Sequence, residues 1–134
     1  MFCLIKVFQT CKYNATGVGS TISAVSPILP SGNEDALIRA IAQIGPISAS
    51  IDASDPSFRF YSSGIYNSKA CNASNLNHAV TLVGYGSIGN LSYYIAKNSW
   101  GSNWGQNGFF QIARKWPNTS NMCGIASMCI YPIP

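Results

Sequence analysis

Charged side chains are scarce in this chain. They make up 9% of its 134 residues, against 47% for apolar residues, whereas a typical soluble domain carries roughly 25% charged residues. Eight Lys and Arg outnumber four Asp and Glu and give a net charge of +4, but the basic residues are scattered and form no stripe. We therefore expect no nucleic-acid partner, and we expect part of the apolar surface to need another protein surface.

Long hydrophobic runs, a targeting signal and metal-ligand spacings are also missing. No stretch is long enough to span a membrane, so we expect no membrane partner. The first ten residues hold only a short apolar patch broken by Lys6, so we expect no signal peptide within this chain. The cysteines show neither C-x-x-C nor Cys/His spacing, which excludes the usual zinc motifs. We expect neither a metal nor a cofactor.

Cysteines and glycosylation sequons are abundant instead. Five cysteines are many for this length and favour disulfide bonds over zinc. Four N-x-S/T sequons lie in polar, turn-like stretches where a glycan could be attached. These glycosylation candidates are Asn14, Asn72, Asn90 and Asn118. Together the two features indicate a secretory or lysosomal history.

The length corresponds to about one domain, and the hydrophobic pattern predicts an α+β fold. One main helix is expected over residues 34–44, because apolar residues recur at helical spacing behind Asn33, a good N-cap residue, and Gly45 and Pro46 follow. Short connections make most of the strands antiparallel. Strands are expected over residues 22–30, 47–52, 79–85, 93–96, 108–113 and 125–131. The aromatic residues from Phe58 to Tyr61 are expected in the core.

One predicted hairpin carries the candidate chemistry. His78, the only histidine of the chain, stands at the head of the apolar run 79–85, and Asn98 stands at the far end of the run 93–96. A glycine-rich turn over residues 84–89 is expected between the two runs. If they pair as antiparallel strands, the imidazole and the carboxamide lie side by side, as a base and the group that orients it.

Several motifs surround this pair in a fixed order. They are Asn77-His78-Ala79-Val80, Gly84-Tyr85-Gly86, Tyr94 to Gly101 (YIAKNSWG), Trp104-Gly105, Gly108-Phe109-Phe110 and Cys123-Gly124-Ile125-Ala126, with Gly45-Pro46-Ile47, Ile51-Asp52, Phe58 to Tyr61 and Gly64-Ile65-Tyr66 upstream. Residues 11–134 thereby resemble the C-terminal half of papain-like cysteine peptidases, in the cathepsin L group. Residues 1–10 are atypical and depart from the family pattern.

The resemblance implies one half of a two-domain enzyme. This chain looks like the β-barrel-like right-hand domain only, and the helical first domain, which bears the nucleophile, is missing. The local signature C-G-x-C-W around the nucleophilic cysteine is absent from the sequence. His78 and Asn98 would then act in a Cys-His-Asn triad, with Trp100 covering their hydrogen bond and Trp104 packed behind. We expect the chain alone to be inactive.

The resemblance also assigns further residues. Peptide or protein substrates would meet a pocket near Ser50, Leu76, Asn77, Ala79 and Met128. Cys71 and Cys123 would form a disulfide bond, Cys11 would pair with the missing domain, and Cys3 and Cys129 have no counterpart. Asn77 stands where relatives often carry an acid, which removes a negative charge beside His78. The family implies a lysosomal or extracellular location.

Two other readings remain at this point. In a silicatein-like biomineralisation protein, which Ser57 to Tyr61 and Ser63 to Tyr66 also resemble, the nucleophile is serine. A non-catalytic gene fragment is the third possibility. The residue at the nucleophile position, upstream of this chain, separates the first two.

Overall fold

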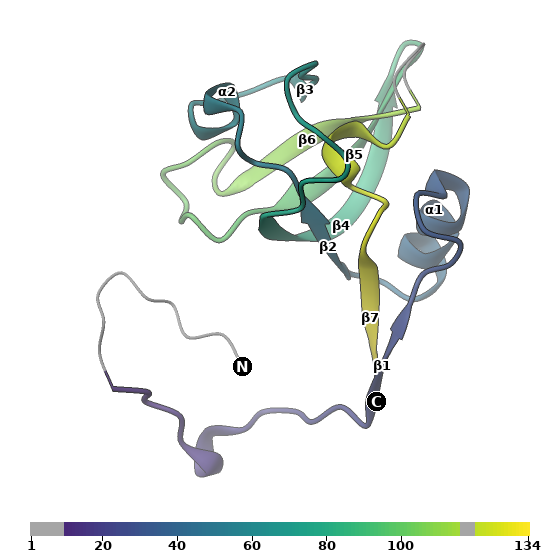
Figure 1. Ribbon diagram of the computed structural model, residues 1–134. Helices are drawn as coiled ribbons and strands as arrows, with labels where there is room; N and C mark the ends of the chain where they lie inside the picture. Colours follow the sequence, from purple (N-terminus) through teal and green to yellow (C-terminus); the bar gives the residue numbers. More distant parts are fainter. Residues whose placement is uncertain (1–9, 116–119) are drawn as a thin grey trace.

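A seven-stranded sheet forms the body of the molecule in the computed structural model, which describes residues 10–115 and 120–134 (Figure 1). Its strand order is β1-β7-β2-β4-β5-β6-β3, and among the described strands only the β3–β6 pair is parallel. The strands are β1 (Ala24–Pro27), β2 (Ile47–Ile51), β3 (Ile65–Tyr66), β4 (His78–Ile88), β5 (Leu91–Lys97), β6 (Phe109–Arg114) and β7 (Cys129–Ile133). The predicted α+β class is confirmed. Within the described residues the sheet is open rather than closed into a barrel, since β1 and β3 stand at its two ends.

Helix α1 (Glu34–Gln43) is the predicted main helix, one residue shorter than expected. The Asn33 side chain accepts a hydrogen bond from the backbone N–H of Ala36 at 2.9 Å, as an N-cap residue does. Leu37 and Ile41 are buried, whereas Ile44 lies past the helix end and is 48% exposed. The helix covers the side of the sheet near β4, on the right of Figure 1.

The β4–β5 hairpin is longer than its sequence pattern indicated. The expected turn over residues 84–89 is wrong, because β4 continues to Ile88, which pairs with Leu91. The turn itself consists of Gly89 and Asn90, with Gly89 at a φ of +58°. A Cβ at Gly86 would come within 2.6 Å of the Tyr93 hydroxyl oxygen. Glycine at this position therefore gives room to a tyrosine ring and does not end the strand.

The C-terminal segment also differs from expectation. The strand predicted over residues 125–131 begins only at Cys129, because a 3-10 turn, η2 (Met122–Gly124), and further turns precede it. Ile125 and Ala126 are nevertheless buried, so their apolar character reflects burial in a turn. The short helix α2 (Pro56–Arg59) was not predicted.

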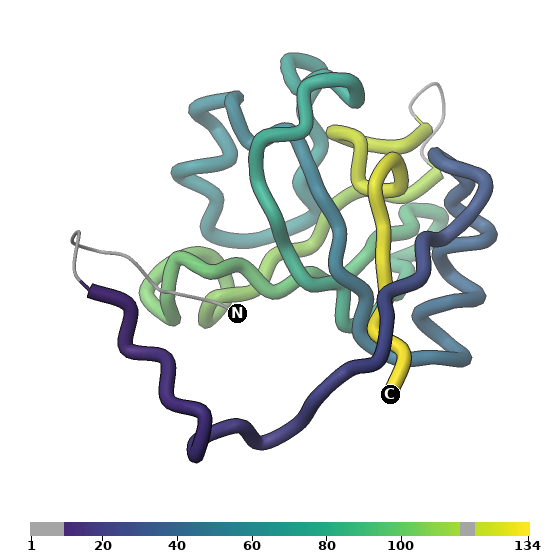
Figure 2. Tube along the Cα trace, turned by 60° about the horizontal axis from the view of Figure 1, so that its bottom comes forward, coloured from purple at the N-terminus to yellow at the C-terminus, as the bar shows by residue number. Residues whose placement is uncertain are grey.

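Residues 10–22 form an arm that leaves the body of the protein (Figure 2). All of them are exposed, and the arm contains one 3-10 turn, η1 (Ala15–Gly17). It joins the sheet where the backbone N–H of Ser23 donates to Ile133. Most of the predicted atypical run 1–10, with Cys3, and the predicted glycosylation site Asn118 lie outside the described residues. In the described ranges no helix combines the length and the apolarity needed to cross a bilayer.

Candidate active site

His78 and Asn98 lie together at one end of the sheet. His78 begins β4, and Asn98 directly follows the last residue of β5. The Nε2 atom of His78 is 2.9 Å from the Oδ1 atom of Asn98. The side-by-side placement expected from the hairpin is thus present, although His78 pairs across the sheet with Ile51 of β2 and not with β5.

The backbone around Asn98 fixes which nitrogen of the imidazole carries the proton. Asn98 is only 3% exposed, and its own N–H donates to the carbonyl of Gly108 at 2.8 Å. The N–H of Ser99 donates to Asn98 Oδ1 at 2.7 Å, so the oxygen, not the amide nitrogen, points this way. An amide oxygen only accepts, and therefore Nε2 of His78 donates. Nδ1 is left as the atom that can exchange a proton with a substrate or nucleophile.

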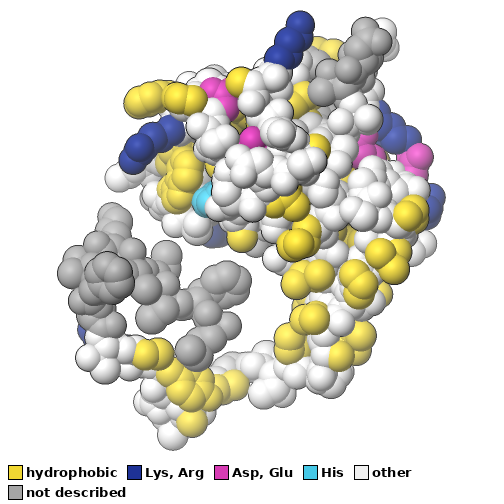
Figure 3. Space-filling model, viewed as in Figure 1, with side chains coloured by type: hydrophobic (Ala, Val, Ile, Leu, Met, Phe, Trp, Pro, Cys, Tyr) yellow, Lys and Arg dark blue, Asp and Glu magenta, His cyan; other side chains and the backbone are white. Residues whose placement is uncertain are grey.

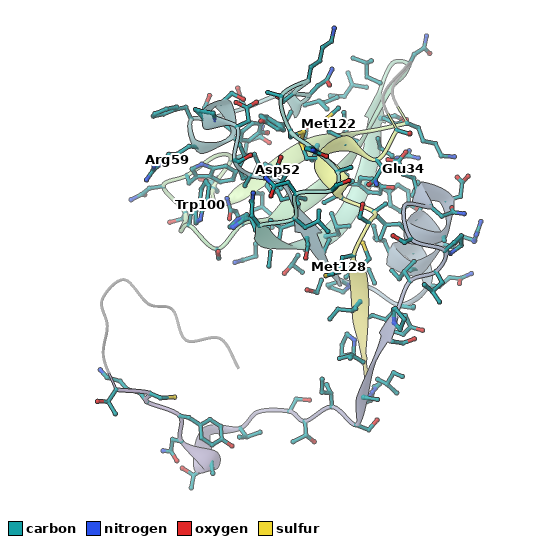
Figure 4. All side chains as sticks on the ribbon, viewed as in Figure 1. Glu34, Asp52, Arg59, Trp100, Met122 and Met128 are labelled. Atoms are coloured by element: carbon teal, nitrogen blue, oxygen red, sulfur yellow. A yellow bond between two sulfur atoms is a disulfide. The ribbon has the colours of Figure 1, made fainter. Side chains whose placement is uncertain are left out.

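Aromatic rings enclose the imidazole. The Trp100 ring lies 4.9 Å from the His78 ring, and the Phe58 ring lies 6.2 Å from it. Trp104 packs edge-on against Trp100 at 5.3 Å, and its Nε1 donates to the carbonyl of Arg59. Trp100 remains 41% exposed; Figure 4 labels it close to Arg59. Trp100 thus lies against the histidine, and Trp104 lies against Trp100.

Phe58 is a member of this site that the sequence analysis assigned only to the core. It is 1% exposed and touches the rings of Tyr66, Trp100, Trp104 and Phe110 as well as His78. Its position depends on α2, whose N-cap residue is Asp55. Hydrogen bonds from Ser68 and Ser57 lower the pKa of Asp55 to about 2. The ionised carboxylate therefore holds α2, and with it Phe58, beneath the imidazole.

The predicted pocket residues divide into two groups. Ser50 is opposite Ala79 in the β2–β4 ladder, and its N–H donates to the carbonyl of Met128 at 3.1 Å. These three are adjacent, and Met128 is 59% exposed. The Leu76 side chain, by contrast, packs over Gly124. Asn77 directs its side chain to Asp52 and to the N–H of Ala53, at 2.8 and 2.9 Å.

A cavity of about 510 Å³ opens beside Asn98 and beside Ala79, the residue that follows His78. Its walls are mostly apolar or uncharged, and Lys97 is the charged residue among them. The lining includes Ser48, Ala79, Thr81, Asn98 and Ser99. Because Ser48 faces Thr81 across the ladder, the cavity lies on the outer face of β2 and β4. Figure 3 shows the histidine, the one cyan side chain, reaching the molecular surface.

The cysteines fall into three environments. Cys71 and Cys123 form the predicted disulfide bond, with Cα atoms 5.0 Å apart. Cys11 is free and exposed on the N-terminal arm. Cys129 is free and buried; burial raises the pKa of its thiol to about 12, and Sγ donates to the carbonyl of Ile125. Cys129 is therefore unsuited to nucleophilic attack. In the described part of the chain, no three His, Cys, Asp or Glu side chains gather as metal ligands would.

Comparison with known proteins gives consistent relatives. The sequence profile described as papain family cysteine protease matches residues 6–133. The chain is 48% identical to cathepsin K of Mus musculus over 124 residues, which cover 92% of this chain and 36% of that protein. It is 47% identical to cathepsin S of Mus musculus, again over 92% of this chain, and covers 35% of it. The chain thus spans about a third of the length of these curated relatives.

Solved structures agree with the sequence relatives. The digestive procathepsin L 3 of the Tenebrio molitor larval midgut superimposes with a TM-score of 0.83 at 39% sequence identity. The match covers 94% of this chain and 40% of that structure. A second digestive proteinase of the same larval midgut, procathepsin L2, gives the same TM-score at 37% identity, over 94% of this chain and 38% of the other.

Proposed function

This chain belongs to the papain family of cysteine proteases, and from that membership we propose that it is the C-terminal half of a cysteine endopeptidase. Residues 11–134 are its right-hand domain, and His78 and Asn98 are its contribution to a Cys-His-Asn triad. The observation that carries the proposal is the 2.9 Å contact between His78 Nε2 and Asn98 Oδ1 at the edge of an open cavity. The nucleophile comes from a segment outside this chain.

The state of the cysteines supports an external nucleophile. Among the four cysteines that the structure describes, Cys71 and Cys123 are joined to each other, Cys129 is buried, and Cys11 lies on an exposed arm. A thiol titrates well above neutral pH unless an imidazolium or another positive group stabilises its thiolate. In the described ranges, His78 makes its ring contacts with Phe58 and Trp100, and a hydrogen bond with Asn98. Its Nδ1 atom is left to meet a sulfur from another domain.

The chemistry assigned to this chain is proton transfer. The imidazole takes the proton of the incoming thiol at Nδ1, and the thiolate attacks the scissile carbonyl carbon. The same nitrogen then gives the proton to the leaving amine as the C–N bond breaks. Asn98 accepts from Nε2–H throughout and keeps the ring oriented. Trp100, against the imidazole, limits the access of water to that hydrogen bond.

The cavity beside Asn98 is the docking face that we assign to the missing helical domain. It is wide enough for side chains of a partner, mostly uncharged, and lined by Asn98, the hydrogen-bond partner of His78. A helix seated there would lie beside Asn98, the residue that orients His78. Substrate peptides would lie along the same edge, with one side chain between Ser50, Ala79 and Met128. The flexible, exposed Met128 side chain would limit the depth of that pocket.

A lysosomal or extracellular location is also part of the proposal. Asn14, Asn72 and Asn90 are all exposed, so glycans at these positions meet no buried surface. The disulfide bond between Cys71 and Cys123 is typical of oxidising compartments. Expression through the secretory pathway, followed by mass spectrometry before and after enzymatic deglycosylation, tests the three sites. A chain that is not secreted and carries no glycan would contradict this location.

A chimera tests the proposed activity. Mouse cathepsin K is 48% identical to this chain over 124 residues, and its first domain is joined to residues 11–134. We expect the chimera to cleave a fluorogenic dipeptide in a manner abolished by alkylation of its thiol, and the chain alone to be inactive. Replacement of His78 by Ala should remove the activity. Cleavage by the chain alone, or by the His78→Ala chimera at the same rate, would refute the proposal.

A further inference from the structure

A buried carboxylate, Asp52, stands at the junction of three segments behind His78. Its side chain is 2% exposed, and Figure 4 labels it within the body of the molecule. Its two oxygens accept hydrogen bonds from Ser54 N at 3.0 Å, Ser54 Oγ at 2.6 Å, Asn72 N at 2.7 Å, Asn77 Nδ2 at 2.8 Å and Asn75 Nδ2 at 3.4 Å. The donors are neutral, and none belongs to Lys or Arg.

Such a site keeps its charge at a cost. Burial by itself would raise the pKa of Asp52, but the hydrogen bonds from Ser54, Asn72 and Asn77 outweigh burial and lower this pKa to about 2. An uncompensated buried charge is strongly destabilising. The carboxylate therefore stays ionised because several donors converge on it, and it in turn fixes the segments that supply them.

The segment fixed most directly is the one that enters β4. Asn77 immediately precedes His78, and both ends of its carboxamide are occupied: Nδ2 donates to Asp52, and Oδ1 accepts from Ala53 N. The backbone N–H of Asn77 donates to the carbonyl of Ile51, the residue that pairs with His78 in the ladder. Asn77, the residue before the histidine, is thus bound through its side chain and its backbone to residues 51–53 at the end of β2.

Asp52 also connects this junction to the disulfide bond. Its carboxylate accepts from the N–H of Asn72, next to Cys71, and its own backbone N–H donates to the carbonyl of Cys123 at 2.8 Å. The loop 72–77, which leads from Cys71 to His78, is therefore held at its start and at its end by one side chain. Little freedom remains for the backbone at His78.

We propose that Asp52 is a positioning residue for His78, which through Asn77 keeps the imidazole aligned on Asn98. The inference deepens the proposed function and rests on it for its biological meaning. Its physical content concerns this chain alone, because the contacts from Asp52 to Asn98 all lie within it. Asp52 touches no reacting atom and acts through Asn77.

The imidazole proton gives the test. His78 is the only histidine, so a chain labelled with ¹⁵N in histidine shows one pair of ring nitrogens by NMR above the imidazole pKa. In the unmodified 134-residue chain we expect the proton on Nε2, where Asn98 Oδ1 accepts it. In the Asp52→Asn variant, the new amide nitrogen only donates, so at least one of the N–H donors that converge on the carboxylate loses its acceptor and the contact with Asn77 loses its charge. We expect the ratio of the Nε2–H to the Nδ1–H tautomer to fall by about fivefold, the effect of one net hydrogen bond.

Two further variants separate positioning from general stability. Asp35→Asn makes the same chemical change at an exposed carboxylate that pairs with Lys115, and the tautomer should remain on Nε2. Asn77→Ala leaves the Asp52 charge in place but removes the connection to His78, and it should shift the tautomer as Asp52→Asn does. If the Asp52→Asn chain does not fold, Asn77→Ala alone decides.

Folded Asp52→Asn and Asn77→Ala chains that keep the proton on Nε2 as firmly as the unmodified chain would overturn the inference. Protection of the β4 and β5 amides from hydrogen exchange shows whether each variant is folded. The readout needs no peptidase activity. A failed chimera therefore bears on the proposed function, and an unmoved tautomer bears on Asp52.

Discussion

The disulfide bond should provide a large share of the stability of this chain. Cys71 and Cys123 are 52 residues apart, and the loop that they close contains β4, β5, β6 and both His78 and Asn98. Closing a loop of about 50 residues removes about 14 cal/mol/K of entropy from the unfolded chain, or about 4 kcal/mol at room temperature. A domain has a typical free energy of unfolding of only about 5–15 kcal/mol.

Equilibrium unfolding in urea, followed by tryptophan fluorescence, measures this contribution. The double variant Cys71→Ser/Cys123→Ser should lose about 4 kcal/mol, with an effect on the denatured state that also changes the slope of the transition. Cys11→Ser is the matched control, since Cys11 is free and exposed on the arm, and it should unfold at the same urea concentration as the unmodified chain. A loss below about 1 kcal/mol in the double variant would refute the loop-entropy reasoning.

Three other perturbations test separate parts of the structure. Folding lowers the pKa of Asp52 from 3.8 to about 2. The ionised carboxylate therefore stabilises the fold fully above about pH 4, and this stabilisation is lost as the pH falls towards 2. A urea midpoint that is the same at pH 5 and pH 2.5 in the unmodified chain would contradict this. Gly105→Ala puts a Cβ 2.6 Å from the Phe109 carbonyl oxygen at a φ of +58° and should lower the free energy of unfolding by about 1–3 kcal/mol. Gly17→Ala, with open space around it, should lower it little. Equal thermal midpoints for the two variants would contradict this. Cys129, whose pKa burial raises to about 12, should resist iodoacetamide at pH 8 until urea unfolds the chain, and mass spectrometry that finds it alkylated in the native protein would contradict its burial.

The sequence predicted correctly those elements that are determined by residues close to one another in the chain. Asn33, followed by acids and apolar residues at helical spacing, marks the start of α1 because its side chain satisfies a free N–H. Apolar runs predicted β2, β4 and β5, because each of these strands buries one face. These features depend on neighbours in the sequence.

Elements that depend on distant contacts were misjudged. Gly84 and Gly86 were assigned to a turn, but both lie within β4. Gly86 is a glycine because the Tyr93 ring occupies the space that a Cβ would need. Residues 125–128 look like a strand, yet the positive φ of Cys123 and Gly124 turns the chain there, beneath the packed Leu76 side chain. Nothing in residues 123–128 by themselves distinguishes buried turn from strand.

The candidate site was predicted in part. The hairpin pattern placed His78 near Asn98, although the contact arises from their positions at the ends of β4 and β5 rather than from direct pairing. Phe58 was missed as a site residue because aromatic residues are usually core residues. Asp52 was missed as well, though an acid at the end of an apolar strand, followed later by an Asn-rich loop, is the signal that could have drawn attention to it.

The central claim is that His78 serves a sulfur atom supplied by another domain. The most direct measurement is the rate at which iodoacetamide alkylates the nucleophilic cysteine of the chimera between pH 4 and pH 9. If the imidazolium stabilises the thiolate, the cysteine should react at pH values well below the usual pKa of a thiol. The cysteine of the His78→Ala chimera should react only as the pH approaches about 8.5, the pKa of a free thiol. Identical pH profiles for the two chimeras would contradict the account.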